Sequence, residues 1–139
     1  MQQASILQLS DYLGPAMAGL VFIAIMARVR DAVRLPLNAA LVIGASGVYM
    51  SGGFGLWEVL YAGLAGPVLG YWALRSYYLI GIGWLLHATW DILHHLYGHP
   101  IWPFMPSSSF GCLIFDTVIG VWFLAGAPTF KREVALSKA

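Results

Sequence analysis

The sequence predicts an all-α integral membrane bundle of five transmembrane helices. Three observations support this fold class: 60% of the 139 residues are hydrophobic, only 9% are charged, and the apolar residues fall into five long stretches. Soluble domains carry about 25% charged residues, so seven basic and six acidic side chains are too few to cover a water-soluble surface of this size. The composition therefore excludes a soluble enzyme domain, a disordered chain and a nucleic-acid-binding protein, which needs a basic face.

The five predicted spans follow from length and turn signals, because a helix needs about 20 mostly apolar residues to cross a bilayer. They cover residues 12–27, 36–50, 56–74, 77–97 and 110–125 of a single transmembrane domain, 1–139. Pro36 stands near the start of the second span, where proline is tolerated, and Pro67 predicts a kink in the third. Residues 129–139 form a short polar tail.

The basic residues predict the orientation of the bundle. With five spans, all of them fall on one side of the membrane: Arg28, Arg30, Arg34, Arg75, Lys131, Arg132 and Lys138. Cytoplasmic loops are enriched in Lys and Arg, so we expect the N-terminus outside and the C-terminus in the cytoplasm. The predicted location is the cell membrane, as a multi-pass protein of a bacterial inner membrane.

Ionisable residues inside the spans are the candidates for function, because a charge at the bilayer centre costs at least about 2.5–3.5 kcal/mol. The fourth span is rich in histidine and carries four such residues at i, i+4, i+7 and i+8: His87, Asp91, His94 and His95. This spacing places them on one helix face within an arc of roughly 100°. In the predicted topology, Glu58 and Asp116 share the outer half of the bilayer with them.

The first interpretation of this group is a metal-dependent enzyme. Imidazole and carboxylate groups bind divalent transition metals such as Zn or Fe, and the predicted ligands are His87, Asp91, His94 and His95. The candidate catalytic carboxylates are Glu58, Asp91 and Asp116, and either Glu58 or Asp116 completes the metal shell or acts as a general base. The predicted activity is hydrolysis or related chemistry on a lipid-like substrate, at a site in the outer half of the bilayer.

Two alternatives remain open. Paired His and Asp side chains also suit metal-free acid–base catalysis, as in an isomerase or cyclase of a lipophilic substrate. A non-enzymatic protein is the other alternative: a metal-binding or proton-coupled transport protein, or a structural subunit. In a structural subunit the same groups form interhelical hydrogen bonds, such as Glu58 with His94 or His87 with Asp116.

The expected partners follow from the environment. They are membrane lipids and a lipophilic small molecule, with no nucleic acid. Five spans enclose little interior, so we expect a homo-oligomer or a subunit of a membrane assembly. Small residues at Gly66-x3-Gly70 and Gly47-x3-Ser51 permit close helix approach within the chain or between copies.

One segment carries a family resemblance. The sequence His87-Ala88-Thr89-Trp90-Asp91-Ile92-Leu93-His94-His95, followed by His99-Pro100 and Phe115-Asp116, resembles the signature region of an uncharacterised family of small bacterial multi-pass membrane proteins. The resemblance covers the fourth and fifth spans, about half of the chain. It implies a membrane protein and carries no activity with it.

The orientation is tested by cysteine labelling. Position 107 precedes the fifth span on the predicted outer side. We expect a Ser107→Cys variant to react with a membrane-impermeant maleimide added from outside the cell. Labelling from the cytoplasmic side alone would overturn the predicted orientation.

Overall fold

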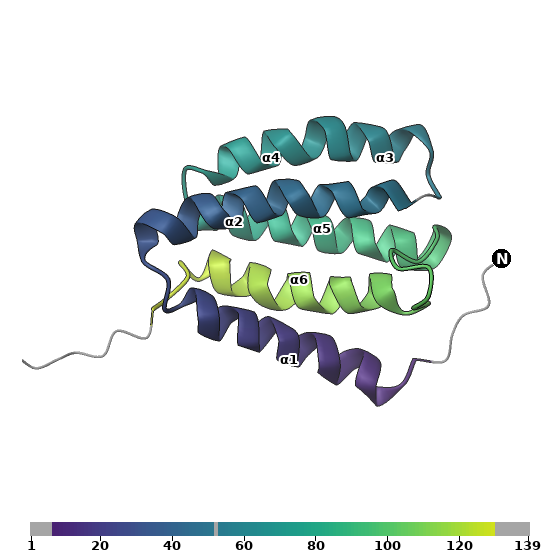
Figure 1. The fold of residues 1–139 in the computed structure, drawn as a ribbon, viewed down its shortest axis with the longest axis horizontal. Helices are drawn as coiled ribbons and strands as arrows, with labels where there is room; N and C mark the ends of the chain where they lie inside the picture. The colour runs from purple at the N-terminus through teal and green to yellow at the C-terminus, as the bar shows by residue number, and fades with distance from the viewer. Residues whose placement is uncertain (1–6, 52, 130–139) are drawn as a thin grey trace, which may run out of the picture.

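Every regular element is helical in the computed structural model, which describes residues 7–51 and 53–129. Five helical segments run back and forth along one axis (Figure 1), which confirms the predicted all-α class. In chain order the elements are α1 (Leu9–Met26), α2 (Asp31–Ser46), the 3₁₀ segment η1 (Gly47–Ser51), α3 (Leu56–Leu60), the π-helical segment η2 (Tyr61–Ala65), α4 (Gly66–Ala73), α5 (Tyr77–Tyr97) and α6 (Ser108–Leu124). η1 continues α2, and α3, η2 and α4 form one uninterrupted rod.

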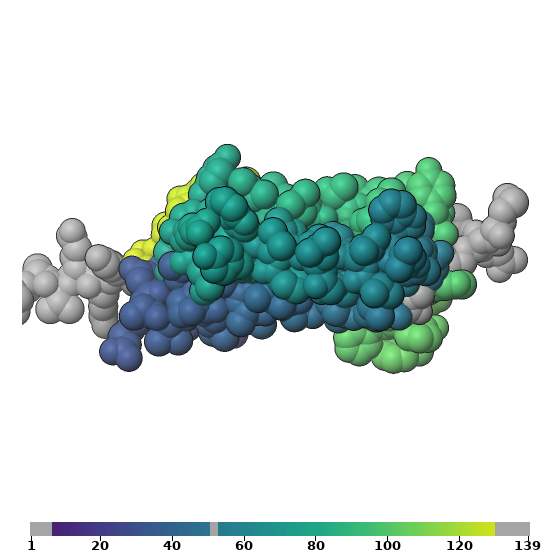
Figure 2. All heavy atoms as spheres, turned by 90° about the horizontal axis from the view of Figure 1, so that it is seen from above, coloured from purple at the N-terminus to yellow at the C-terminus, as the bar shows by residue number. Residues whose placement is uncertain are grey.

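Helix α5 is the centre of the bundle, because it packs against α6, α4 and α2. Helix α1 packs mainly against α6 and forms one edge, while α3 and α4 form the opposite edge (Figure 1). In Figure 2 the blue and teal surfaces of α2, α3 and α4 run along the length of one face. The apolar core lies where α2, α4, α5 and α6 meet, around Val42, Ile80, Ile119 and Phe123.

The second helix begins earlier than the sequence predicted. Its span was placed at 36–50, whereas α2 begins at Asp31, and Pro36 lies inside the helix. An acidic residue in the first turn favours this earlier start, because it complements the positive end of the helix dipole. Arg34, predicted to lie in a loop on the cytoplasmic side, therefore lies within α2 and is 2% exposed.

Arg34 joins the ends of several helices. Its Nε donates to the Tyr77 hydroxyl at 2.8 Å, and its Nη1 donates to the Met26 carbonyl at 3.3 Å. Its Nη2 pairs with the Asp31 carboxylate. The guanidinium carbon also lies 4.8 Å from the centre of the Tyr77 ring and 5.7 Å from that of Trp122. Each guanidinium nitrogen thus has a partner, which is what a buried charge requires.

The other described basic residues gather at the same end of the bundle. The connections from α1 to α2 and from α4 to α5 lie together at this end, so Arg28, Arg30 and Arg75 share it (Figure 1). The N-terminal end of α1 lies at the opposite end of the bundle (Figure 1). The remaining basic residues of the predicted inner side, and nearly all of the predicted 129–139 tail, lie outside the described residues: Lys131, Arg132 and Lys138.

A π-turn, η2, directly precedes the part of the rod that contains Pro67, where the sequence predicted a kink; the kink itself stays a prediction. Proline has no N–H to donate, so the helix loses a bond at this position. The Gly66 N–H instead bonds to the Tyr61 carbonyl, five residues earlier. π-Turns of this kind occur frequently at functional sites.

The glycine spacing on α4 serves packing within the chain. A Cβ at Gly66 would overlap the Ser46 side chain, and a Cβ at Gly70 would overlap Ile43. Both positions let the backbones of α2 and α4 approach closely. A Cβ at Gly47 would meet no atom within 4 Å, so that glycine has no such role in the chain.

The bundle has an apolar exterior and a partly polar interior. Each α-helix exposes large apolar side chains, such as Leu20 at 53%, Val68 at 46% and Val121 at 57%. Among the described residues, two helices are long and apolar enough to cross a membrane, Leu9–Met26 and Asp31–Met50, and Ser108–Leu124 is a shorter apolar helix. This is compatible with membrane association, and the five-span arrangement stays a prediction.

The close approach of α4 to α2 can be tested by adding a methyl group. We expect Gly66→Ala to lower the free energy of unfolding by about 1–3 kcal/mol, because the new Cβ overlaps Ser46. Gly44→Ala is the matched control on α2, where a Cβ meets no atom within 4 Å and alanine is the better helix former. Denaturant titration in detergent measures the free energy of unfolding of both variants. Equal stability of the two variants would refute the close approach.

Candidate functional site

Five of the six predicted site residues are buried. Their side chains come from three segments and are at most 6% exposed: Glu58 on α3, His87, Asp91 and His94 on α5, and Asp116 on α6. His95 is only half-buried and lies beside the Phe110 ring, with ring centres 5.4 Å apart. At 100° per residue, His94 lies about 20° from His87 around the helix, whereas His95 lies about 80° away. That difference is enough to turn His95 out of the interior.

Tyr49 organises the buried group, although it was not among the predicted site residues. Its hydroxyl donates to Asp91 Oδ1 at 2.9 Å and also lies 3.2 Å from the His87 carbonyl oxygen. The side chain is 1% exposed and comes from η1, so it joins the end of α2 to α5. The sequence signal that could have identified Tyr49 is a tyrosine within an apolar stretch, because a buried hydroxyl needs a hydrogen-bond partner.

His87 presents one free nitrogen to the interior. Its Nδ1 lies 2.9 Å from the Gly83 carbonyl oxygen. A carbonyl only accepts hydrogen bonds, so Nδ1 carries the hydrogen and the Nε2 of the neutral ring is an acceptor. Nε2 is buried and has no hydrogen-bond partner among the described residues. The Gly83 contact therefore holds the imidazole ring in a fixed orientation inside the bundle.

Like the imidazole of His87, the carboxylate of Asp91 has a hydrogen-bond partner at only one of its two polar atoms. Oδ1 accepts the Tyr49 hydrogen bond, whereas Oδ2 is buried without a partner among the described residues. Buried polar atoms are nearly always hydrogen-bonded, so two unpartnered atoms one helical turn apart need an explanation. A polar ligand that reaches both side chains would supply one.

Glu58 and His94 form a contact between the third and fourth predicted spans. Glu58 Oε1 lies 3.4 Å from His94 Nε2, and His94 Nδ1 lies 3.3 Å from the His99 carbonyl oxygen. The structure thus brings together one of the interhelical pairs that the sequence suggested. Asp116 lies on α6, which packs along α5.

Two aromatic rings separate this polar group from the outside of the bundle. Tyr61 and Trp90 are stacked, with ring centres 4.8 Å apart and an interplanar angle of 1°. Tyr61 also lies 5.3 Å from the Tyr49 ring and 5.6 Å from the His87 ring, measured between centres. The stacked pair is therefore in contact with the polar group on its inner side.

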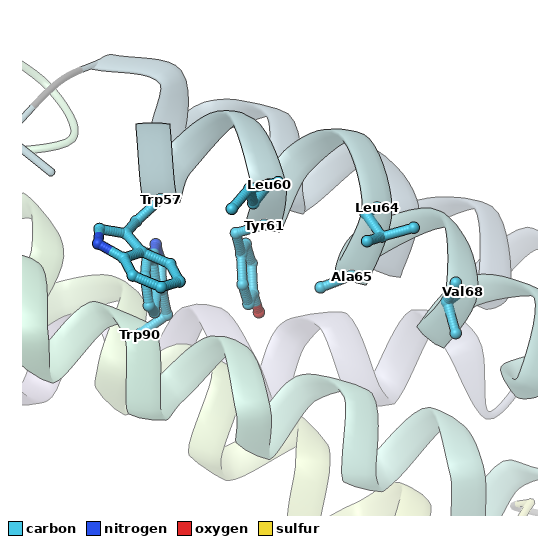
Figure 3. A pocket seen from close by; sticks show the side chains of 7 residues that line it. All are labelled: Trp57, Leu60, Tyr61, Leu64, Ala65, Val68 and Trp90. Carbon is cyan, nitrogen blue, oxygen red and sulfur yellow. The ribbon is translucent and has the colours of Figure 1, made fainter. Parts of the chain in front are cut away.

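A groove lies on the outer side of the stacked pair. It consists of two neighbouring hollows of about 540 Å³ and 390 Å³ that share Tyr61, Ala65, Val68 and Trp90. We call it the lateral groove; Figure 3 shows the side chains that line its larger part, on the α3–η2–α4 rod and on α5. The remaining lining residues are Trp57, Leu60, Leu64, Leu69, Leu86 and Thr89. The lining contains no charged side chain.

Metal binding stays a prediction. Within residues 7–51 and 53–129, no three His, Cys, Asp or Glu side chains are grouped so that they could hold a metal ion. The predicted ligands instead face different partners, because His87 bonds to Gly83, Asp91 to Tyr49, and His94 contacts Glu58.

Comparison with known proteins identifies one family. The family of unknown function DUF6010 matches residues 10–129. No curated protein and no solved structure matches the chain. The match confirms that the chain resembles an uncharacterised family; the bacterial origin and membrane nature implied by the resemblance stay predictions.

The bond between Tyr49 and Asp91 can be tested by removing one hydroxyl. We expect Tyr49→Phe to lower the free energy of unfolding by about 1–3 kcal/mol, because Asp91 then loses its partner in a buried site. Tyr78→Phe on α5 is the control, since Tyr78 is 59% exposed. In a double-mutant cycle with Asp91→Asn, additive effects would show that the two side chains do not interact.

Proposed function

We propose that this chain, which belongs to the DUF6010 family of unknown function, is a membrane-embedded acid–base catalyst that acts on a lipophilic molecule. One observation carries the proposal. His87 Nε2 and Asp91 Oδ2 are buried, have no hydrogen-bond partner within residues 7–51 and 53–129, and lie one helical turn apart on α5, behind the aromatic pair that lines an apolar groove. Groups that can transfer protons therefore lie close to an apolar groove that suits a lipophilic molecule.

The distribution of polarity supports the membrane part of the proposal. Apolar side chains are exposed on each α-helix, while Arg34, Glu58, His87 and Asp91 are buried. Water-soluble proteins have the reverse pattern, and exposed apolar patches of this extent mark membrane or protein contacts. We propose that all five helical segments cross the bilayer, with the basic end in the cytoplasm and the Asp91 end toward the outside.

The proposed chemistry is an isomerisation or cyclisation, in which one proton leaves the substrate and another is returned. His87 Nε2 removes a proton from the substrate, because the Gly83 bond fixes its lone pair as an acceptor. Asp91, protonated at Oδ2, returns a proton to the substrate, and Tyr49 holds the carboxyl group in place through Oδ1. Transfer of the proton from His87 to Asp91 then restores both groups. Positioned acid and base groups of this kind accelerate reactions by about 10²–10⁴-fold each.

The proposal is tested with purified protein in lipid nanodiscs that contain a membrane lipid extract. Mass spectrometry follows the extract over time. We expect wild-type protein to convert at least one lipophilic species, and His87→Ala and Asp91→Asn to slow that conversion by about 10²–10⁴-fold. Thr117→Val is the control, because Thr117 is exposed on α6 and its hydroxyl bonds only to its own helix, at the Leu113 carbonyl.

Two outcomes would count against the mechanism. Equal conversion by wild type and all three variants, or no conversion by wild type, would remove the catalytic role. A stoichiometric divalent metal that is present in wild type and lost in His87→Ala would instead support the metal-dependent hydrolysis predicted from the histidine spacing. Metal analysis of the same samples provides that measurement.

A further inference from the structure

We infer that the basic end of the bundle binds the head groups of anionic phospholipids, with Arg75 as the central contact. This inference rests on the membrane crossing proposed above, and it names the class of lipid that meets this end. Three features of the described residues support it: the positions of exposed tryptophan and tyrosine, the division of charge between the two ends, and the way in which the Arg75 side chain is held.

Exposed tryptophan and tyrosine side chains lie only at the two ends of the described bundle. At the basic end they occupy the last turn of α4 and the first turn of α5, and at the opposite end they lie on α1, on α3 and around the end of α5. The large apolar side chains exposed between the two ends are Leu, Ile, Val and Met, such as Leu20 and Leu41. The exposed aromatic residues are Tyr71, Trp72 and Tyr78, which we call the basic-end girdle, and Tyr12, Trp57, Tyr97 and Trp102 at the other end.

The two aromatic sets are separated by about the thickness of a bilayer. From Tyr78 to Tyr97, helix α5 rises about 28 Å, at about 1.5 Å per residue. The hydrocarbon core of a bilayer is about 30 Å thick, and Trp and Tyr are enriched at both of its interfaces. Arg75 lies in the connection between α4 and α5, so the basic-end girdle places it at the level of the lipid head groups.

The described arginines all lie at the basic end, where Asp31 is the one described carboxylate. Asp31 pairs with the buried Arg34. The other three arginines are exposed and have no carboxylate within 4 Å in residues 7–51 and 53–129: Arg28, Arg30 and Arg75. This end therefore carries an uncompensated positive charge, which complements the anionic lipids of a cytoplasmic leaflet.

The basic-end girdle holds the Arg75 side chain in place. The guanidinium carbon lies 4.4 Å from the centre of the Trp72 ring and 5.0 Å from that of Tyr71. Its Nη2 also donates to the Tyr71 hydroxyl at 3.4 Å. A guanidinium has five N–H groups, so the exposed side chain keeps others available for a ligand. A planar guanidinium bonds to phosphate through two parallel hydrogen bonds, which suits a lipid phosphate at this level.

The test uses purified protein in nanodiscs made from equal parts of phosphatidylglycerol and phosphatidylcholine. Both lipids carry a phosphate, but only phosphatidylglycerol has a net negative charge. Native mass spectrometry identifies the lipids that stay bound after the protein is released. We expect phosphatidylglycerol to be retained in preference, and Arg75→Gln to lower its retention about fivefold, which corresponds to about 1 kcal/mol. Arg75→Lys keeps the charge and should restore part of the retention.

Matched variants separate this site from general lipid contact. Trp72→Leu removes the ring nearest the guanidinium and should lower the retention of phosphatidylglycerol. Trp102→Leu removes a ring of similar exposure at the opposite end and should leave the retention unchanged. Equal retention of the two lipids by wild type, or no effect of Arg75→Gln, would overturn the inference. Binding of soluble glycerol phosphate with the same dependence on Arg75 would overturn a lipid as the source of the phosphate.

The lipid site and the proposed catalysis fail separately. We expect His87→Ala to keep the preference for phosphatidylglycerol, because His87 is buried inside the bundle. Retention of phosphatidylglycerol without conversion of any lipophilic species would leave the lipid site and remove the catalysis. Conversion without a lipid preference would leave the catalysis and remove the lipid site. Wild-type protein that does not insert into nanodiscs would overturn the membrane crossing and the lipid site together.

Discussion

The hydrogen bond from Tyr49 to Asp91 is the contact on which the rest of the site depends. Asp91 lies at the centre of the bundle without exposure, and a carboxylate in such a place needs a donor for each oxygen. Tyr49 supplies one donor and, in doing so, joins the end of α2 to α5. The second oxygen has no partner in the part of the chain that the structure describes, so Tyr49 anchors the residue through one oxygen and leaves the other available.

Buried polar groups of the bundle differ in how far their hydrogen-bonding capacity is met. At the basic end, every nitrogen of the Arg34 guanidinium has a partner, which describes a structural junction between helices. Among the described residues, His87 and Asp91 each keep an unpartnered atom, and so does Asn38 of α2, at Oδ1. A saturated polar network stabilises a fold, whereas an unsaturated one costs free energy unless a ligand completes it. The proposed function uses the unpartnered atoms of His87 and Asp91 because they lie one helical turn apart on the same helix.

The backbone of the α3–η2–α4 rod accounts for the lateral groove beside the polar group. Pro67 removes one helical bond, and the resulting π-turn runs from Tyr61 to Ala65. Gly66 and Gly70 hold α4 tightly against α2, while the rod loses contact with α5 beyond η2. Tyr61 therefore faces a gap in which Trp90 from α5 can stack on it. Close packing on one side of the rod and divergence on the other produce the groove together.

The sequence by itself determined the helical class, the number of helical segments and the shared face of His87, Asp91 and His94, because apolar length and the 3.6-residue period are local properties. Only the tertiary structure decided which partners those residues meet. Periodicity could not show that Tyr49 reaches Asp91 or that Glu58 contacts His94, since both pairs join segments far apart in the chain. Periodicity also placed His95 at the edge of the helix face that it shares with His87, Asp91 and His94. In the structure its ring lies beside the Phe110 ring of α6. Arg34 was assigned to a loop because the second span was predicted to begin at residue 36, and its burial became possible only because Tyr77, Met26 and Asp31 surround it.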